Sequence, residues 1–179
     1  MNYEEKTMKS ERVYEGKIVN LRVDTVELPG KKYSKREIVE HPGAVGIIPI
    51  KEDGSLILVK QYRKPVEKML LEIPAGKIEI NEEPKETAIR ELIEETGLKA
   101  NKMEYILEFY TSPGFTNEKV YLFLATDLEF VKQDPDENEY IQVKEIPIHK
   151  LIDMVNKGEI TDSKTIISIF FAKKYLDSK

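Results

Sequence analysis

The chain has 179 residues, of which 40% are hydrophobic, and it carries a formal net charge of −5. This length suffices for one domain with a well-buried core and a small appendage. The negative charge argues against general binding to nucleic acid or to anionic membranes, since either needs a basic surface. Cysteine is absent, which excludes disulfides and thiol chemistry and suits a cytoplasmic protein.

Neither a signal peptide nor a membrane span is expected. Residues 1–12 are charged throughout and contain no apolar core, unlike a secretory leader. The longest apolar stretches, residues 44–50 and 165–172, are far too short to cross a bilayer. We therefore expect a protein without membrane association.

The first part of the chain predicts two or three antiparallel strands. Apolar and polar residues alternate over residues 12–40, with breaks at Gly16 and at Pro29-Gly30. Two or three strands are too few to form a stable core of their own. They must therefore pack on the main domain or on a second subunit. We assign residues 1–42 to an N-terminal strand segment, with a probable dimer contact as its role, and residues 43–179 to the main domain.

The rest of the chain alternates between strand and helix patterns. An Asp53-Gly54 pair between two apolar runs predicts a hairpin turn. Strands are predicted at residues 44–50, 56–63, 69–73, 103–111, 119–128 and 140–143, and helices at residues 84–96, at 147–158 and from a cap at Thr161 or Asp162 onward. The strand at 69–73 leads into Pro74-Ala75-Gly76, so a strand feeds the loop before the first helix.

The first helix has clear end signals. Pro84 suits a first helical position and Gly97 suits a left-handed cap. Ala88 and Leu92, with Ile89 and Ile93 a little further round the axis, are predicted to form its buried stripe.

Three glutamates share one face of this helix. Glu91, Glu94 and Glu95 are related by steps of three and four residues or are adjacent. A solvated acidic face is the usual explanation of such a cluster. Like charges at this spacing repel, however, and a hard divalent cation would turn the repulsion into attraction because Mg²⁺ and Mn²⁺ prefer oxygen ligands.

The spacing around this helix is specific. Gly76 is followed after five residues by Glu82 and, after seven more, by the run Arg90-Glu91-Leu92-Ile93-Glu94-Glu95-Thr96-Gly97-Leu98. This pattern resembles the signature of the Nudix hydrolases without a departure. A chance match in a chain of this length has a probability on the order of 10⁻⁶, from average residue frequencies.

The resemblance implies a fold, an activity and a set of metal ligands. The fold is an α+β, Nudix-type α/β/α sandwich with a mixed central sheet. The activity is hydrolysis of a nucleoside diphosphate linked to another moiety, with Mg²⁺ or Mn²⁺ as cofactor. By resemblance, the metal ligands are Glu91, Glu94, Glu95 and the carbonyl of Ala75, while Glu82 and Arg90 orient them.

Further residues resemble the branch of the family that hydrolyses ADP-ribose. By composition, Ser112-Pro113-Gly114 is an ordinary turn, yet a proline at this distance after the helix is what that branch shows. The residues that would grip the substrate are Arg36, Glu37, Arg63, Glu72, Ser112, Pro113 and Gly114. For the four charged residues the alternative is an edge-strand charge pair and ordinary surface residues.

The segment at residues 131–139 is polar, acidic and interrupted by proline, which by default predicts a mobile solvated loop. In similar enzymes a loop here carries two glutamates, one acting on the attacking water and one reaching a metal. By resemblance these are Glu137 and Glu139, with Glu137 narrowly preferred as the base and Glu139 as a metal ligand. Glu95 joins them in the predicted catalytic set. The two histidines, His41 and His149, are expected to be structural.

The predicted function is Mg²⁺-dependent hydrolysis of ADP-ribose to AMP and ribose 5-phosphate. One alternative keeps the chemistry with another nucleoside diphosphate derivative, such as a nucleotide sugar or a dinucleotide. Another is a Nudix-fold module that binds a nucleotide without cleaving it, although such modules commonly lose the glutamates that are present here. The resemblance also implies a homodimer in which the N-terminal strands exchange between subunits.

Overall fold

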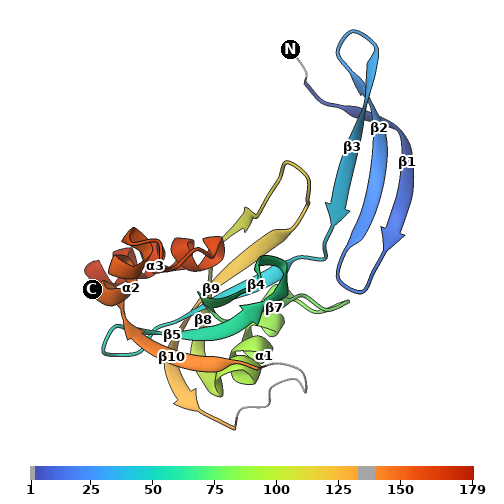
Figure 1. Cartoon of the computed structure of the whole chain (residues 1–179). Helices are drawn as coiled ribbons and strands as arrows, with labels where there is room; N and C mark the ends of the chain where they lie inside the picture. Colours follow the sequence, from blue (N-terminus) through green and yellow to red (C-terminus); the bar gives the residue numbers. More distant parts are fainter. Residues whose placement is uncertain (1–2, 133–139) are drawn as a thin grey trace. The chain divides into compact units, whose positions relative to one another are not determined.

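A computed structural model describes residues 3–132 and 140–179 of the chain. The chain divides into two compact units, coloured by sequence in Figure 1. The N-terminal unit consists of Met1–Gly43 and Phe109–Lys119, and the main unit consists of Ala44–Glu108 and Val120–Lys179.

The N-terminal unit is built on a three-stranded antiparallel sheet in the order β1-β2-β3. Its strands are β1 (Lys6–Glu15), β2 (Asn20–Leu28) and β3 (Lys32–Glu40). The predicted antiparallel strands are confirmed, but β1 begins well before the predicted start at residue 12. Every residue of β1 is exposed, so no buried face imposes the alternation on which the sequence prediction depended.

The described residues of the main unit form two sheets and three helices. Their elements are β4 (Ala44–Pro49), β5 (Ser55–Arg63), β6 (Lys68–Glu72), β7 (Ala75–Lys77), β8 (Leu98–Tyr110), β9 (Lys119–Phe130), β10 (Gln142–Pro147), α1 (Pro84–Thr96), α2 (Ile148–Asn156) and α3 (Ser163–Asp177). One sheet has the order β7-β4-β9-β8 and the other β10-β5-β6. The first is mixed, because β4 pairs with β9 in parallel and with β7 antiparallel.

Helices cover both faces of these strands, as Figure 1 shows for α1 on one side and α2 and α3 on the other. Strand β4 explains the arrangement, because both of its faces are apolar. Val45 and Ile47 pack into the cluster that contains the α1 residues, whereas Ile48 packs into the cluster that contains residues of α2 and α3. A strand buried on both faces reads as a continuous apolar run. The predicted α/β/α sandwich with a mixed sheet is confirmed.

The predicted hairpin between residues 44–50 and 56–63 is wrong in its pairing. The turn itself forms, since Gly54 has φ +80° and the Ser55 amide donates to Asp53 Oδ1 at 2.9 Å. The two strands then diverge into different sheets and share one isolated bridge, between Ile50 and Leu56. A turn signal determines where the chain reverses, but sheet membership depends on partners distant in sequence.

The last strand also differs from its prediction. Residues 140–143 were expected, but β10 runs from Gln142 to Pro147 and pairs with β5. Its first four residues are exposed, so apolar alternation could not reveal it. Helices α2 and α3 follow as predicted, and the Asp162 side chain caps α3 by accepting from the Thr165 amide. No helix of the described ranges is long and apolar enough to span a membrane.

Helix α1 has the predicted ends, Pro84 and Thr96. Gly97 caps it at φ 67°, and its amide donates to the Ile93 carbonyl at 2.8 Å. Leu92, on the face of the helix that packs into the core, is 1% exposed, but Ile89 is 38% exposed. The prediction that Ile89 contributes to the buried stripe is therefore wrong, and the buried stripe instead includes Thr87.

The difference between these two positions predicts a difference in stability. Leu92→Ala should lower the free energy of unfolding by about 2–5 kcal/mol, because it leaves a cavity in a closed core. Ile89→Ala, on the same helix, should cost under about 1 kcal/mol because the side chain is partly solvated already. Urea denaturation followed by circular dichroism measures both, and equal losses would contradict the assignment of the buried face.

Candidate active site

The backbone groups of the candidate site lie in the short segment between β6 and α1. The Ile47 amide of β4 donates to the Pro74 carbonyl at 2.9 Å. Strand β7 then pairs antiparallel with β4, with Ala75 opposite Gly46 and Gly76 opposite Val45. The segment that bears the predicted carbonyl ligand is therefore held on a buried strand.

Helix α1 packs against β4 and β7, which brings two of its glutamates to this segment. Glu95 is 3% exposed; its Oε2 accepts from the Ala75 amide at 2.9 Å and its Oε1 from Gln61 Nε2 at 3.5 Å. Glu91 lies so close to Gly76 that a Cβ there would be 1.9 Å from the carboxyl carbon. Glycine at this position is thus required by the close approach of Glu91.

The guanidinium of Arg90 joins three carboxylates. It donates to both oxygens of Glu82, at 2.9 and 3.0 Å, and through Nη1 to Glu91 at 2.8 Å and to Glu94 at 2.7 Å. The bonds from Arg90 lower the pKa of Glu82 to about 2, and the bonds to Glu82 in turn raise the pKa of Arg90. Arginine is suited to this role because its planar fork holds a carboxylate at two points.

These carboxylates could bind a divalent metal ion, but in this structure they accept hydrogen bonds from other groups of the protein. Among the residues described, no three His, Asp or Glu side chains form a group that could hold a metal ion as they stand. Glu91 and Glu94 turn to Arg90, and Glu95 turns to Ala75. All of their donors are hard oxygens, which suit Mg²⁺ or Mn²⁺. The cradle at Gly76, which a Cβ would fill, gives Glu91 room beside the backbone, so the residues fit such an ion.

Two of the predicted substrate residues meet each other. Arg63 Nε donates to Glu72 Oε1 at 2.8 Å, and Nη2 donates to Oε2 at 2.9 Å. Burial would raise the pKa of the Glu72 carboxyl, but the bonds from Arg63 and the charge of Lys164 outweigh burial and lower it. Sequence reasoning missed Lys164, which donates to Glu72 Oε2 at 2.6 Å from 92 residues away. A lysine in the first turn of an ordinary helix carries no local signal of such a contact.

The other predicted substrate residues belong to the N-terminal unit. Arg36 donates through Nε to Glu5 at 2.9 Å, and Glu37 is exposed. The Ser112 carbonyl accepts from two amides, those of Phe115 and Thr116. Pro113 and Gly114 are exposed in this turn. The structure therefore places Arg36, Glu37, Ser112, Pro113 and Gly114 in one unit and the glutamates of α1 in the other.

The predicted loop glutamates, Glu137 and Glu139, lie outside the described residues. Their roles as base and metal ligand stay predictions. His41 lies in the connection between β3 and β4, where its Nδ1 accepts from the Gly43 amide at 3.1 Å. His149 is the second residue of α2.

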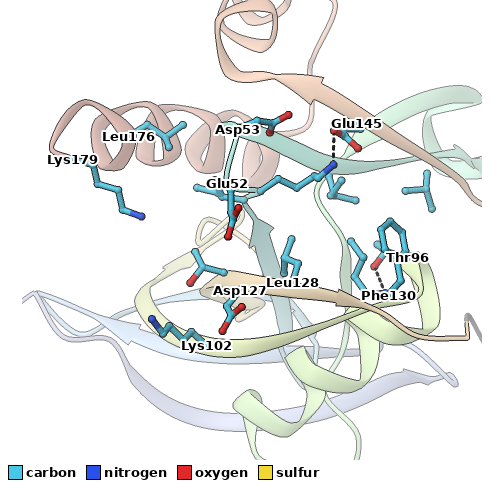
Figure 2. A pocket seen from close by; sticks show the side chains of 16 residues that line it. Glu52, Asp53, Thr96, Lys102, Asp127, Leu128, Phe130, Glu145, Leu176 and Lys179 are labelled. Carbon is cyan, nitrogen blue, oxygen red and sulfur yellow. Dashed lines mark hydrogen bonds and ion pairs between the residues drawn. The ribbon is translucent and has the colours of Figure 1, made fainter.

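A pocket of about 1040 Å³ opens elsewhere in the main unit (Figure 2). Its wall combines apolar side chains, such as Leu128 and Leu176, with charged residues of both signs, and an ion pair joins Lys51 to Glu145 at 2.8 Å. None of the described residues predicted to bind metal or substrate lines it. We therefore place the candidate active site at α1 and β7 and not in this pocket.

The sandwich fold and the glutamate-bearing helix agree with the Nudix-type architecture expected from the sequence. A family model for the NUDIX domain matches residues 40–167, and a model for the nucleoside diphosphate sugar hydrolase N-terminal domain matches residues 5–39. The chain belongs to the Nudix family.

Three relatives with named activities match more than nine-tenths of the chain. An ADP-ribose pyrophosphatase of Bacillus subtilis is 48% identical over 168 residues, which are 93% of this chain and 91% of that protein. A methanol dehydrogenase activator of Bacillus methanolicus is 45% identical with the same coverage. An ADP-ribose pyrophosphatase of Mycobacterium tuberculosis is 37% identical, over 91% of this chain and 80% of that one.

A solved structure agrees on the fold. The crystal structure of an ADP compounds hydrolase matches with a TM-score of 0.86, covering 98% of this chain and 95% of the other. At 23% identity, this likeness supports the architecture alone.

Proposed function

We propose that the protein hydrolyses the pyrophosphate bond of ADP-ribose and releases AMP and ribose 5-phosphate. The observation that carries the hydrolytic activity is the close approach of Glu91 and Glu95 to the Ala75-Gly76 backbone. The choice of substrate is supported by the 48% identity to an ADP-ribose pyrophosphatase and by the Ser112-Pro113-Gly114 element.

Each residue has a task in this reaction. Glu91, Glu94, Glu95 and the Ala75 carbonyl would hold Mg²⁺ or Mn²⁺, with Arg90 orienting Glu91 and Glu94. When bound, the ion neutralises phosphate charge and activates water. A carboxylate that does not bind metal must accept the proton of the attacking water, and we assign this to Glu137, with Glu139 as the alternative.

Chromatographic product analysis tests this function. The purified protein is incubated with Mg²⁺, or with Mn²⁺, and with ADP-ribose, nucleotide sugars, dinucleoside polyphosphates and nucleoside triphosphates. Cleavage of ADP-ribose to AMP and ribose 5-phosphate with the highest kcat/KM is the expected result. No cleavage of any compound with either metal would favour a non-catalytic nucleotide-binding module.

A second candidate is cleavage of another nucleoside diphosphate derivative. A GDP-mannose pyrophosphatase of Yersinia pestis is 35% identical over 73% of this chain and 70% of that protein. The name of the N-terminal family model also refers to hydrolases of nucleoside diphosphate sugars. A higher kcat/KM for a nucleotide sugar in the same panel would select this candidate.

Arg63→Ala should raise KM for ADP-ribose more than it lowers kcat. The Arg63 guanidinium is held by Glu72 through one edge, and such a fork is suited to a diphosphate or to stacking on adenine. Steady-state kinetics, with Arg63→Lys as the variant that keeps the charge but loses the fork, measures both constants. An unchanged KM would remove Arg63 from the substrate site.

We also propose that the protein is a homodimer acting in the cytoplasm, with the N-terminal unit at the contact. The sheet of this unit exposes Met8, Val13, Tyr14 and Tyr33, and a three-stranded sheet gains stability from a partner surface. Sedimentation equilibrium tests the assembly; a monomeric mass at micromolar concentration would contradict it.

A further inference from the structure

The N-terminal turn of α3 contains a connected group of polar side chains. Asp162 Oδ2 accepts from the Thr165 amide at 3.0 Å and from the Thr165 hydroxyl at 2.6 Å. The same hydroxyl accepts from the Ile73 amide at 2.8 Å. Lys164 Nζ bridges Asp162 Oδ1, at 3.0 Å, and Glu72 Oε2, at 2.6 Å. Helix α3 therefore binds two consecutive residues just before the Ala75-Gly76 backbone.

The charges in this group alternate in sign along the chain of contacts. Arg63 binds Glu72, Glu72 binds Lys164, and Lys164 binds Asp162. Glu72 is 1% exposed, and a carboxylate so deeply buried must have its charge compensated by hydrogen-bonded partners. Two cations share its Oε2 oxygen, since Arg63 Nη2 lies at 2.9 Å and Lys164 at 2.6 Å.

The orientation of Arg63 depends on this carboxylate. Glu72 occupies the Nε–Nη2 edge, and Nη1 has no hydrogen-bond partner among the described residues. The Arg63 side chain is 40% exposed, so its Nη1 end can reach a ligand. The bonds to Glu72 raise the pKa of Arg63 against the effect of burial, and the charge of Glu95 adds to this.

We propose that Lys164 is a positioning residue for substrate binding: it holds Glu72 in the orientation that presents Arg63 to the substrate's diphosphate. The inference rests on the proposed function and extends it to a helix outside the signature. Lys164 itself is mostly buried, at 16% exposure, and it would act on substrate binding through Glu72 and Arg63. Its loss would leave Arg63 as the cationic partner of the buried carboxylate among the described residues and free the Arg63–Glu72 pair to reorient.

The test measures KM and kcat for ADP-ribose in the full-length protein. Lys164→Met should raise KM by about tenfold, the scale of a lost supporting contact, with a much smaller change in kcat. Lys164→Arg keeps the charge and should restore most of the affinity. Lys173→Met is the matched control, because Lys173 lies on the same helix but pairs with Asp177 on the exposed side; it should leave KM unchanged.

A double variant separates positioning from general destabilisation. In an Arg63→Ala background, adding Lys164→Met should raise KM no further, because Lys164 acts through Arg63. A multiplicative increase in KM in the double variant, or a normal KM in Lys164→Met, would overturn the inference. If Lys164→Met does not fold by circular dichroism, Lys164→Gln decides, since it keeps a hydrogen-bonding group without the charge; a normal KM there would likewise overturn it.

If the proposed function is wrong, the experiments give results that differ from those expected if only the role of Lys164 is wrong. If the unaltered protein cleaves another compound better than ADP-ribose, the substrate assignment fails and the Lys164 variants are compared on that compound. If it cleaves none, binding of ADP-ribose by isothermal titration calorimetry replaces KM. Equal dissociation constants for the unaltered protein and for Lys164→Met, or binding by neither, would overturn the positioning role.

Discussion

Glu95→Gln is expected to lower kcat by at least about a hundredfold, more than is typical for loss of a residue that only supports a metal ligand. Glu95 is almost fully buried against the Ala75 backbone, and its proposed role is to bind the metal that activates water. Glutamine has the same shape and an oxygen that can still accept from the Ala75 amide, so the fold should persist. Kinetics with Mg²⁺ and thermal melts measure the two effects.

Glu86→Gln is the matched control for this prediction. Glu86 lies in the first turn of the same helix and is exposed, so its neutralisation should leave kcat within about twofold, as for ordinary surface changes. Chelation of divalent ions should abolish turnover in both the unaltered protein and this control, and added Mg²⁺ should restore it. Near-normal turnover by Glu95→Gln would refute the metal assignment.

Gly76→Ala should abolish most of the activity while changing stability little. A Cβ at this position would lie 1.9 Å from both the Glu91 carboxyl carbon and its Oε1, so the carboxylate must move. The clashing atoms are the far end of the Glu91 side chain, which can change rotamer, so we expect its displacement to cost little folding energy. Because a ligand misplaced by about 1 Å can cost a hundredfold in rate, kcat should fall on that scale with a melting temperature close to that of the unaltered protein.

A double variant tests whether the added methyl group acts through Glu91. Gly76→Ala combined with Glu91→Gln should be no slower than Glu91→Gln alone, because the ligand that the methyl group displaces has already been disabled. Multiplicative losses would show that the added methyl group perturbs another part of the site. Full activity of Gly76→Ala alone would mean that Glu91 does not need its place beside the backbone.

Local signals were sufficient where a residue's neighbours in sequence determine its conformation. Pro84 and Gly97 predicted both ends of α1, since caps depend on the groups of one helical turn. The apolar run at residues 44–50 predicted a strand, which is β4. The same reasoning failed for Ile89, because the periodicity of a helix defines a stripe but not how far the neighbouring strands extend over it.

In the candidate site too, some features follow from local sequence and others depend on the tertiary structure. Helical spacing alone placed Glu91, Glu94 and Glu95 on one face of α1. Gly76 and Glu82 were identified because they occupy fixed positions of the Nudix signature. Helical spacing brings Arg90 near Glu94, but it could not show that Arg90 also binds Glu82, because that contact depends on the loop before α1 folding back. The assignments of Glu137 and Glu139 stay predictions from resemblance.

The sequence by itself determined the family and the extent of the first helix and predicted the metal-binding chemistry, because these depend on residue types at short, fixed separations. Only the tertiary structure decided that Gly76 makes room for Glu91, that Arg63 and Glu72 bind each other, and that Lys164 joins them. The physical reason is distance along the chain. Contacts across 92 residues form when separate elements pack on a common core, and no local pattern of polarity encodes which side chains then meet.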